Sequence, residues 1–265
     1  MEYNRYPVDI PQHTELVSNP LVYKEIGNFF QNDYNNISKN MKYDESGMLI
    51  MPYSHDEMIN IMNDEYKRLE SDYFSSYTPK TKRMYIFGWL YREFQITGVA
   101  FGPTGEPNMN PLITPGEYAF TMAHEIAHTK GVIKEEDANL VAAYICLTSE
   151  NEYLRYSGYV YTIYSLSYLV ACTNVKEYYE TYQKSFSKEC VNDSIARSNY
   201  WKQHDMLGKF SEFINNIYLF LQGDKGTISY EDNIDVKEEG GKYYVQSYSR
   251  YQALYLWIYF DLLCL

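Results

Sequence analysis

Long apolar runs and a secretory leader are both missing from this 265-residue chain. No uncharged apolar run approaches the roughly 20 residues that a helix needs to span a bilayer. The nearest, Ser157 to Thr173, is so rich in serine and tyrosine that it indicates a buried helix instead. Since no secretory signal begins the chain, the sequence predicts a soluble polypeptide.

Clustered basic residues and closely spaced cysteines are missing as well. The formal net charge is −12, with 23 Lys and Arg against 35 Asp and Glu. Phosphate contacts need grouped Lys and Arg, so we expect no nucleic-acid partner. The cysteines contain no CxxC pair, which argues against a cysteine zinc site or a dense disulfide framework. One or two disulfides, or four buried thiols, remain open for Cys146, Cys172, Cys190 and Cys264.

Apolar periodicity predicts an α+β fold that is predominantly α-helical, with a small sheet, in one continuous domain. An extended arm covers residues 1–20, and the sheet falls within Lys80 to Met109. We expect helices over Pro20–Met41, Met58–Tyr73, about Glu135 to Ser149, much of 150–222, and Tyr248 to the end. The second of these is opened by Ser54-His55-Asp56-Glu57. We expect β-strands at Met84–Phe87 and Val99–Phe101, and a hairpin within 223–247 that includes Thr227–Tyr230 and Tyr243–Val245.

The most informative local pattern is an HExxH motif, His124-Glu125-Ile126-Ala127-His128. Two histidines four residues apart lie on one face of a helix, where both can bind one metal ion, and the Glu between them can reach a metal-bound water. This pattern is typical of zinc-dependent hydrolases, most often peptidases. It predicts Zn²⁺ as cofactor, a peptide or protein as substrate, and Glu125 as the general base.

The residues on both sides of the motif favour a helix of defined length. Thr114-Pro115-Gly116-Glu117 is typical of a helix start, with Thr114 as N-cap and Pro115 in the first turn. Gly131 follows three residues after His128, where a glycine commonly ends a helix.

A catalytic zinc usually has three protein ligands, so a third ligand is expected near the histidines. In metzincins a histidine follows six residues after the second motif histidine, but Lys134 stands there. A carboxylate is the alternative, and Glu135-Glu136-Asp137 begins the next expected helix. The helix dipole by itself favours acids at the start of a helix. This effect explains the presence of at least two of these three acids without any metal.

A further donor usually stabilises the oxyanion of the transition state in such enzymes. Three residues are candidates for this role: His204, Tyr248 and Arg250. The sequence does not bring any of them to the metal, and His, Tyr and Arg are common on protein surfaces.

Several segments together resemble the DUF3810 family of bacterial proteins, which are regarded as membrane-anchored zinc metallopeptidases. They are Gly98–Asn110, the motif with Gly131, the run Asp137-Ala138-Asn139, Asn216–Leu219 and Ser247–Arg250. The resemblance spans about residues 80–265, is strongest from Gly98 to Cys146, and is weak before residue 80.

The resemblance implies a zincin-like metallopeptidase domain over 81–265, on which an arm and helices of residues 1–80 pack. It implies His124 and His128 as zinc ligands, with Asp137 as the third ligand and Glu136 as second choice. Here Asp137 replaces the glutamate usual in the family and is one methylene shorter. Ser249 likewise replaces a glycine of the family in the run Ser247–Arg250, which would bring Tyr248 or Arg250 to the transition state.

The resemblance further implies a cell-membrane protein with its catalytic domain outside the cytoplasm, held by an anchor absent from this chain. In zincin-like folds an edge strand beside the motif helix binds substrate as an added strand, and Val99–Phe101 could be that strand or a supporting loop. Two other functions stay open. One is a zinc-binding sensor or scaffold without peptidase activity, and the other is a cytoplasmic metallopeptidase that cleaves a transcriptional repressor.

Overall fold

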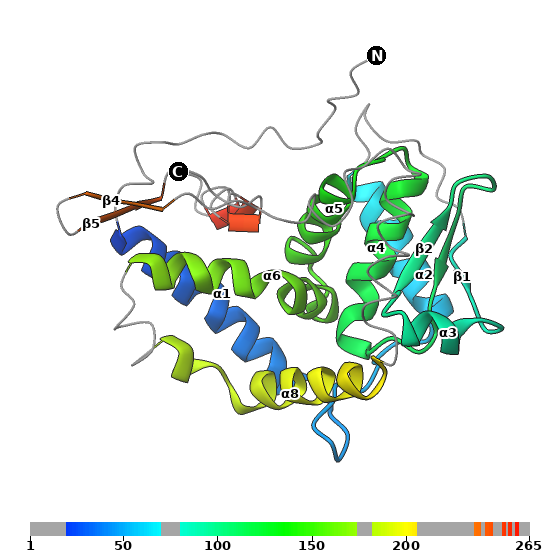
Figure 1. Cartoon of the computed structure of the whole chain (residues 1–265), viewed down its shortest axis with the longest axis horizontal. Coiled ribbons are helices and arrows are strands. Elements are labelled where there is room, and N and C mark those ends of the chain that lie inside the picture. Colours follow the sequence, from blue (N-terminus) through cyan, green and yellow to red (C-terminus); the bar gives the residue numbers. More distant parts are fainter. Residues whose placement is uncertain are drawn as a thin grey trace.

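The computed structural model is mostly helical, with one small mixed sheet beside the helices (Figure 1). It describes residues 20–69, 80–173, 182–205, 236–239 and 242–245, together with 251, 252, 254, 255, 258 and 259. The helices of eight or more residues are α1 (Pro20–Asn40), α2 (His55–Arg68), α4 (Tyr118–Thr129), α5 (Glu135–Leu147), α6 (Glu152–Thr173) and α8 (Lys188–Gln203). Short helical turns are α3 (Gly88–Glu93), η2 (Pro115–Glu117) and η4 (Gln183–Ser185).

Helix α4 lies between helices α5 and α6 and the sheet. It packs on α5 and α6 on one side and on strands β2 and β3 on the other (Figure 1). Helix α1 packs along α6, and α8 packs on α1. Helix α4 contributes Ala119, Ala123 and Ala127 to the core, all fully buried. These small side chains let the neighbouring elements approach α4 closely, which fixes its position.

The sheet has three strands, β1 (Lys82–Arg83), β2 (Gly98–Phe101) and β3 (Glu106–Met109), in the order β1-β3-β2. Strand β3 pairs in parallel with β1 and antiparallel with β2, so β2 is an edge strand. A separate two-stranded hairpin joins β4 (Val236–Glu239) to β5 (Lys242–Val245).

Helix α2 illustrates how local sequence sets an element. The Ser54 side chain accepts a hydrogen bond from the Glu57 backbone, and the Glu57 carboxylate accepts one from the Ser54 backbone. This capping box starts the helix where the sequence predicted, and Met58, Met62 and Tyr66 then recur every four residues on its buried face. The predicted continuation to Tyr73 falls partly outside the described residues.

The prediction of a strand at Met84–Phe87 is wrong. The strand there is β1, two residues earlier, and its last backbone bond joins the Met84 amide to the Met109 carbonyl at 3.0 Å. Because β3 ends at Met109, the following residues have no strand to pair with and turn into α3. Apolar side chains alone suggested a strand, yet Tyr85 and Ile86 are 69% and 80% exposed.

Other sequence expectations are confirmed in outline. Helices α1 and α5 nearly cover the ranges expected for them, and α6 and α8 lie within the stretch 150–222 that was expected to be mostly helical. Strand β2 falls on the expected Val99–Phe101, and β5 on Tyr243–Val245. The Thr227–Tyr230 run lies outside the described residues, and the hairpin partner is Val236–Glu239 instead. Cys146 and Cys190 are buried free thiols. Within the described part of the chain, no helix is both long and apolar enough to cross a membrane.

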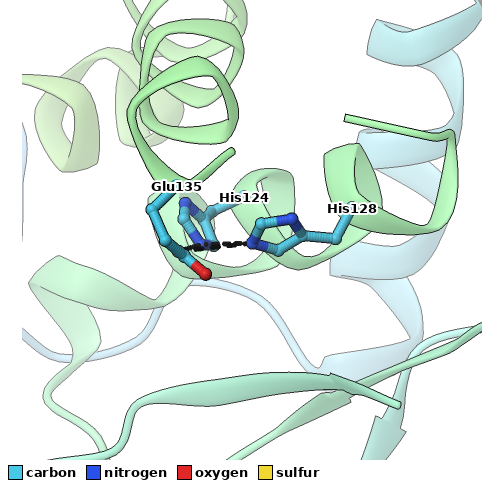
Figure 2. A group of neighbouring side chains, drawn as sticks. All are labelled: His124, His128 and Glu135. Carbon is cyan, nitrogen blue, oxygen red and sulfur yellow. Dashed lines mark hydrogen bonds and ion pairs between the residues drawn. The ribbon is translucent and has the colours of Figure 1, made fainter. Parts of the chain in front are cut away.

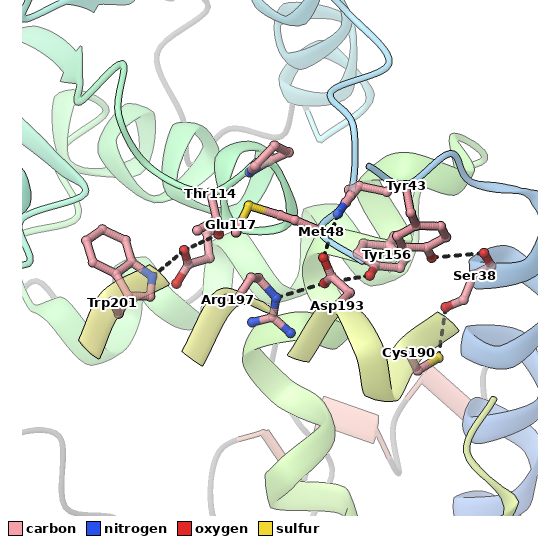
Figure 3. Close-up of polar contacts among 12 residues, drawn as sticks. Ser38, Tyr43, Met48, Thr114, Glu117, Tyr156, Cys190, Asp193, Arg197 and Trp201 are labelled. Carbon is pink, nitrogen blue, oxygen red and sulfur yellow. Dashed lines mark hydrogen bonds and ion pairs between the residues drawn. The ribbon is translucent and has the colours of Figure 1, made fainter. Parts of the chain in front are cut away.

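A buried polar cluster holds α8 against the start of α4 (Figure 3). Asp193, fully buried, accepts hydrogen bonds from the Leu49 amide, the Tyr156 hydroxyl and the Arg197 guanidinium. At the adjoining N-terminal end of α4, Glu117 accepts hydrogen bonds from the Trp201 indole and the Thr114 hydroxyl. These contacts tie the helix that carries the HExxH motif to a distant part of the chain.

Candidate metal centre

The turn after α4 orients the second motif histidine. Gly131 has φ +96°, its amide bonds the His128 carbonyl at 3.0 Å, and the Val132 amide bonds the Ala127 carbonyl at 3.1 Å. This is a Schellman motif, in which glycine takes the left-handed conformation that other residues avoid. The prediction that Gly131 ends the helix is therefore confirmed. The same turn brings the Val132 carbonyl 2.7 Å from His128 Nδ1.

The start of the motif helix differs in detail from the expectation. Thr114 does precede the first helical turn, with Pro115 in it, but that turn is the 3-10 helix η2 and α4 proper begins at Tyr118. The Thr114 hydroxyl donates to the Glu117 carboxylate and does not cap a backbone amide. The Glu117 carboxylate is a stronger acceptor, because a charged partner strengthens a hydrogen bond.

His124 and His128 meet as the HExxH spacing predicts. Their Nε2 atoms lie 3.0 Å apart, and their rings stand nearly perpendicular, at 86°. Because the Val132 carbonyl accepts the proton on Nδ1 of His128, it is Nε2 that loses its proton when the ring becomes neutral, and the resulting lone pair is directed toward His124. The pair thus has two ring nitrogens directed at one point.

Glu135, the first residue of α5, completes the group from the neighbouring helix. Its Oε2 lies 3.0 Å from His124 Nε2 and 3.4 Å from His128 Nε2, and its side chain is buried. Figure 2 shows the carboxylate and both rings directed at one another. One ligand atom from each of the three residues lies within 4.8 Å of the others, so the group could hold a metal ion.

The structure does not bring Asp137 or Glu136 into this group, although one of them was expected as the third ligand. The reason is the geometry of α5, where successive residues are rotated by about 100°. Glu135 lies on the buried face that continues through Ala138 and Ala142, both fully buried against the core. Glu136 and Asp137 are only half-buried. No sequence signal within α5 singles out Glu135, because buried residues follow all three acids at helical spacing: Leu140, Val141 and Ala143 are buried as well.

The charges of the three residues are strongly coupled. Burial works to lower the pKa of His128, but the hydrogen bond and charge of Glu135 outweigh it and raise that pKa to about 9. Burial conversely works to raise the pKa of Glu135, yet the two histidines hold it well below its usual range. A proton is therefore retained between the histidines and Glu135 at neutral pH when no metal replaces it.

This donor set fits a divalent metal ion. Two imidazole nitrogens and one carboxylate are the protein ligands of many catalytic zinc sites, which leave one position open for water. Among the described residues, the buried His124 Nδ1 has no hydrogen-bond partner. A metal ion held by Nε2 would not change this, so the fit rests on the three converging donors.

Glu125 lies against strand β2, where a Cβ built on Gly98 would come 2.6 Å from its Oε1. It is 5% exposed. Burial raises the pKa of Glu125, while the neighbouring histidines act to lower it. A carboxylate with a raised pKa is a stronger base than an ordinary glutamate.

Of the remaining candidates, His204 does not join this group. His204 follows α8, and its Nδ1 pairs with the Glu93 carboxylate of α3 at 3.1 Å. Arg92 donates to the same carboxylate, so His204 belongs to a separate polar cluster. Tyr248 and Arg250 lie outside the described residues.

Comparison with known proteins gives the family and no more. The sequence model of DUF3810, described as a protein of unknown function, matches residues 1–236, and the chain belongs to this family. No curated protein and no protein of solved structure matches the chain.

Proposed function

We propose that this DUF3810 member is a zinc-dependent metallopeptidase with a zincin-like core. The observation that carries the proposal is the convergence of His124, His128 and Glu135 on one point, with Glu125 on the same motif helix. Zinc bound to the three would lower the pKa of a bound water to about 7 and polarise the scissile carbonyl. Glu125 would take the proton from that water and deliver it to the leaving amine.

Strand β2 supports a peptide as the substrate. The Asn110 amide bonds the Thr97 carbonyl at 2.9 Å, so the backbone bonds to β3 are made by Thr97 and every second residue after it. Gly98 and Ala100 therefore turn their amides and carbonyls away from β3, toward the open edge of the sheet. An edge of this kind binds an extended peptide as an additional strand, close to Glu125.

The first test separates metal binding from hydrolysis. Zinc content is measured after dialysis, and hydrolysis is followed with labelled casein, with and without chelator. We expect one zinc per chain and hydrolysis that the chelator removes. Glu125→Gln should keep the zinc and lower the rate by about 100- to 10,000-fold, the usual share of a general base. Zinc binding without any hydrolysis, across casein and a mixed peptide library, would instead favour the sensor or scaffold function.

A second test concerns the third ligand. Glu135→Gln should lose most of the zinc, because an amide is a much weaker ligand than a carboxylate. Glu136→Gln is the matched control, one residue along the same helix, and should retain it. Equal zinc content in both variants would contradict the proposed ligand set.

The location at the cell membrane and the alternative function of cleaving a transcriptional repressor stay predictions. No contact among the described residues tests either of them.

A further inference from the structure

The Glu125 side chain rests on the backbone of the edge strand β2. A Cβ atom built on Gly98 would lie 2.6 Å from Glu125 Oε1, 2.7 Å from its Cγ and 2.9 Å from its Cδ. Real Cβ atoms essentially never approach other heavy atoms so closely. Any side chain at position 98 would therefore displace the Glu125 side chain along its whole length, not only at its end.

The backbone at Gly98 does not itself require glycine. Gly98 does not have a positive φ. Among the described glycines, positive φ values occur at Gly47, Gly105 and Gly131. A glycine inside a strand weakens the strand, and commonly marks a place where another group approaches the backbone closely. Here the approaching group is Glu125, and α4 packs on β2 along this edge.

We propose that Gly98 is a positioning residue for Glu125, leaving the space in which its carboxylate sits. The absence of a side chain at position 98 thus sets how closely the Glu125 carboxylate can lie against β2. The functional consequence rests on the proposed peptidase activity. The contact itself does not, and it can be tested without any substrate.

The first experiment is a double-mutant cycle on thermal stability, with the full chain free of metal and again with zinc. Gly98→Ala should lower Tm by several degrees, since overpacking costs about 1–3 kcal/mol and each kcal/mol shifts Tm by about 2–4 °C in a chain of this size. In a Glu125→Ala background the same substitution should have no effect or raise Tm, because the obstructing side chain is gone.

Gly102→Ala is the matched control, since a Cβ at Gly102 meets nothing within 4 Å. It should shift Tm equally little in both backgrounds. A loss of stability by Gly98→Ala that is the same with and without Glu125 would overturn the proposal, as would no loss at all.

The second experiment uses the zinc-loaded protein and labelled casein. Gly98→Ala should keep one zinc per chain and a KM near that of the wild type, while kcat falls by about 100-fold, the effect of a 1 Å misplacement of a reacting group. Glu125→Asp is one methylene shorter, so in the Gly98→Ala background it should restore part of the lost kcat. Strictly additive losses would contradict a positioning role. Absence of hydrolysis by the wild type would refute the peptidase proposal, and the stability cycle would still decide whether Gly98 positions Glu125.

Discussion

Replacing Asp193 by alanine should strongly destabilise the fold, because this side chain organises the buried cluster behind the motif helix (Figure 3). Asp193 is fully buried and accepts hydrogen bonds from the Leu49 amide at 2.8 Å, the Tyr156 hydroxyl at 2.7 Å and Arg197 Nε at 2.8 Å. In the variant three donors lose their acceptor, and one of them is a cation.

The size of the expected stability loss follows from the positive charge of Arg197. Burial works to lower the pKa of Arg197, but Asp193 raises it above its ordinary value, and an arginine stays charged in any case. Removing one partner of a buried ion pair costs about 3–5 kcal/mol, which is a large part of the roughly 5–15 kcal/mol that stabilises a native protein. At about 2–4 °C per kcal/mol, Tm should fall by about 6–20 °C.

Circular dichroism melting curves of the wild type and three variants would measure this. Asp193→Asn keeps an acceptor for the Leu49 amide and should lose less, and Tyr156→Phe loses one hydrogen bond and should cost about 1 kcal/mol. A Tm of Asp193→Ala within 2 °C of the wild type, or a larger loss for Tyr156→Phe, would refute the reasoning from the buried charge.

Three further changes test other parts of the structure. Gly131→Ala places alanine at φ +96°, which should lower the free energy of unfolding by at least about 1–2 kcal/mol. It should also weaken zinc binding, measured by titration calorimetry, because the Val132 carbonyl moves away from His128. The pKa of His128 is raised above its ordinary value of 6.5, to about 9, so its contribution to the stability of the metal-free protein is complete below pH 6.5 and is lost as the pH rises through 9. Zinc must displace that proton, so zinc affinity should rise with pH up to about 9, and buffers of different ionisation enthalpy would detect the released proton. Ser54→Ala removes the N-cap of α2 and should cost about 1 kcal/mol in urea unfolding, a loss that Glu57→Gln should only partly reproduce.

The sequence predicts best what a few consecutive residues decide. The HExxH spacing places His124 and His128 together on any regular helix, and Gly131 ends that helix through its own conformational preference. The capping box at Ser54 begins α2 in the same way. In each case the interaction that fixes the structure lies within one turn of the chain, so it can be recognised without knowing the fold.

Features that depend on a second element could not be predicted with the same certainty. Which of three consecutive acids reaches the histidines depends on the rotation of α5 against α4, and only the packed fold settles it in favour of Glu135. The chain after Arg83 reads as a strand, but β3 ends at Met109 and offers it no partner. The space at Gly98 likewise has meaning only because Glu125, far along the chain, lies against it.

The central claim is that His124, His128 and Glu135 together bind one zinc ion. Anomalous scattering at the zinc edge, from crystals grown with zinc, tests it most directly. The account predicts one strong peak about 2.0–2.2 Å from His124 Nε2, His128 Nε2 and a carboxylate oxygen of Glu135. A peak bonded to Glu136 or Asp137 in place of Glu135, or zinc bound elsewhere while the two histidines stay uncoordinated, would contradict it.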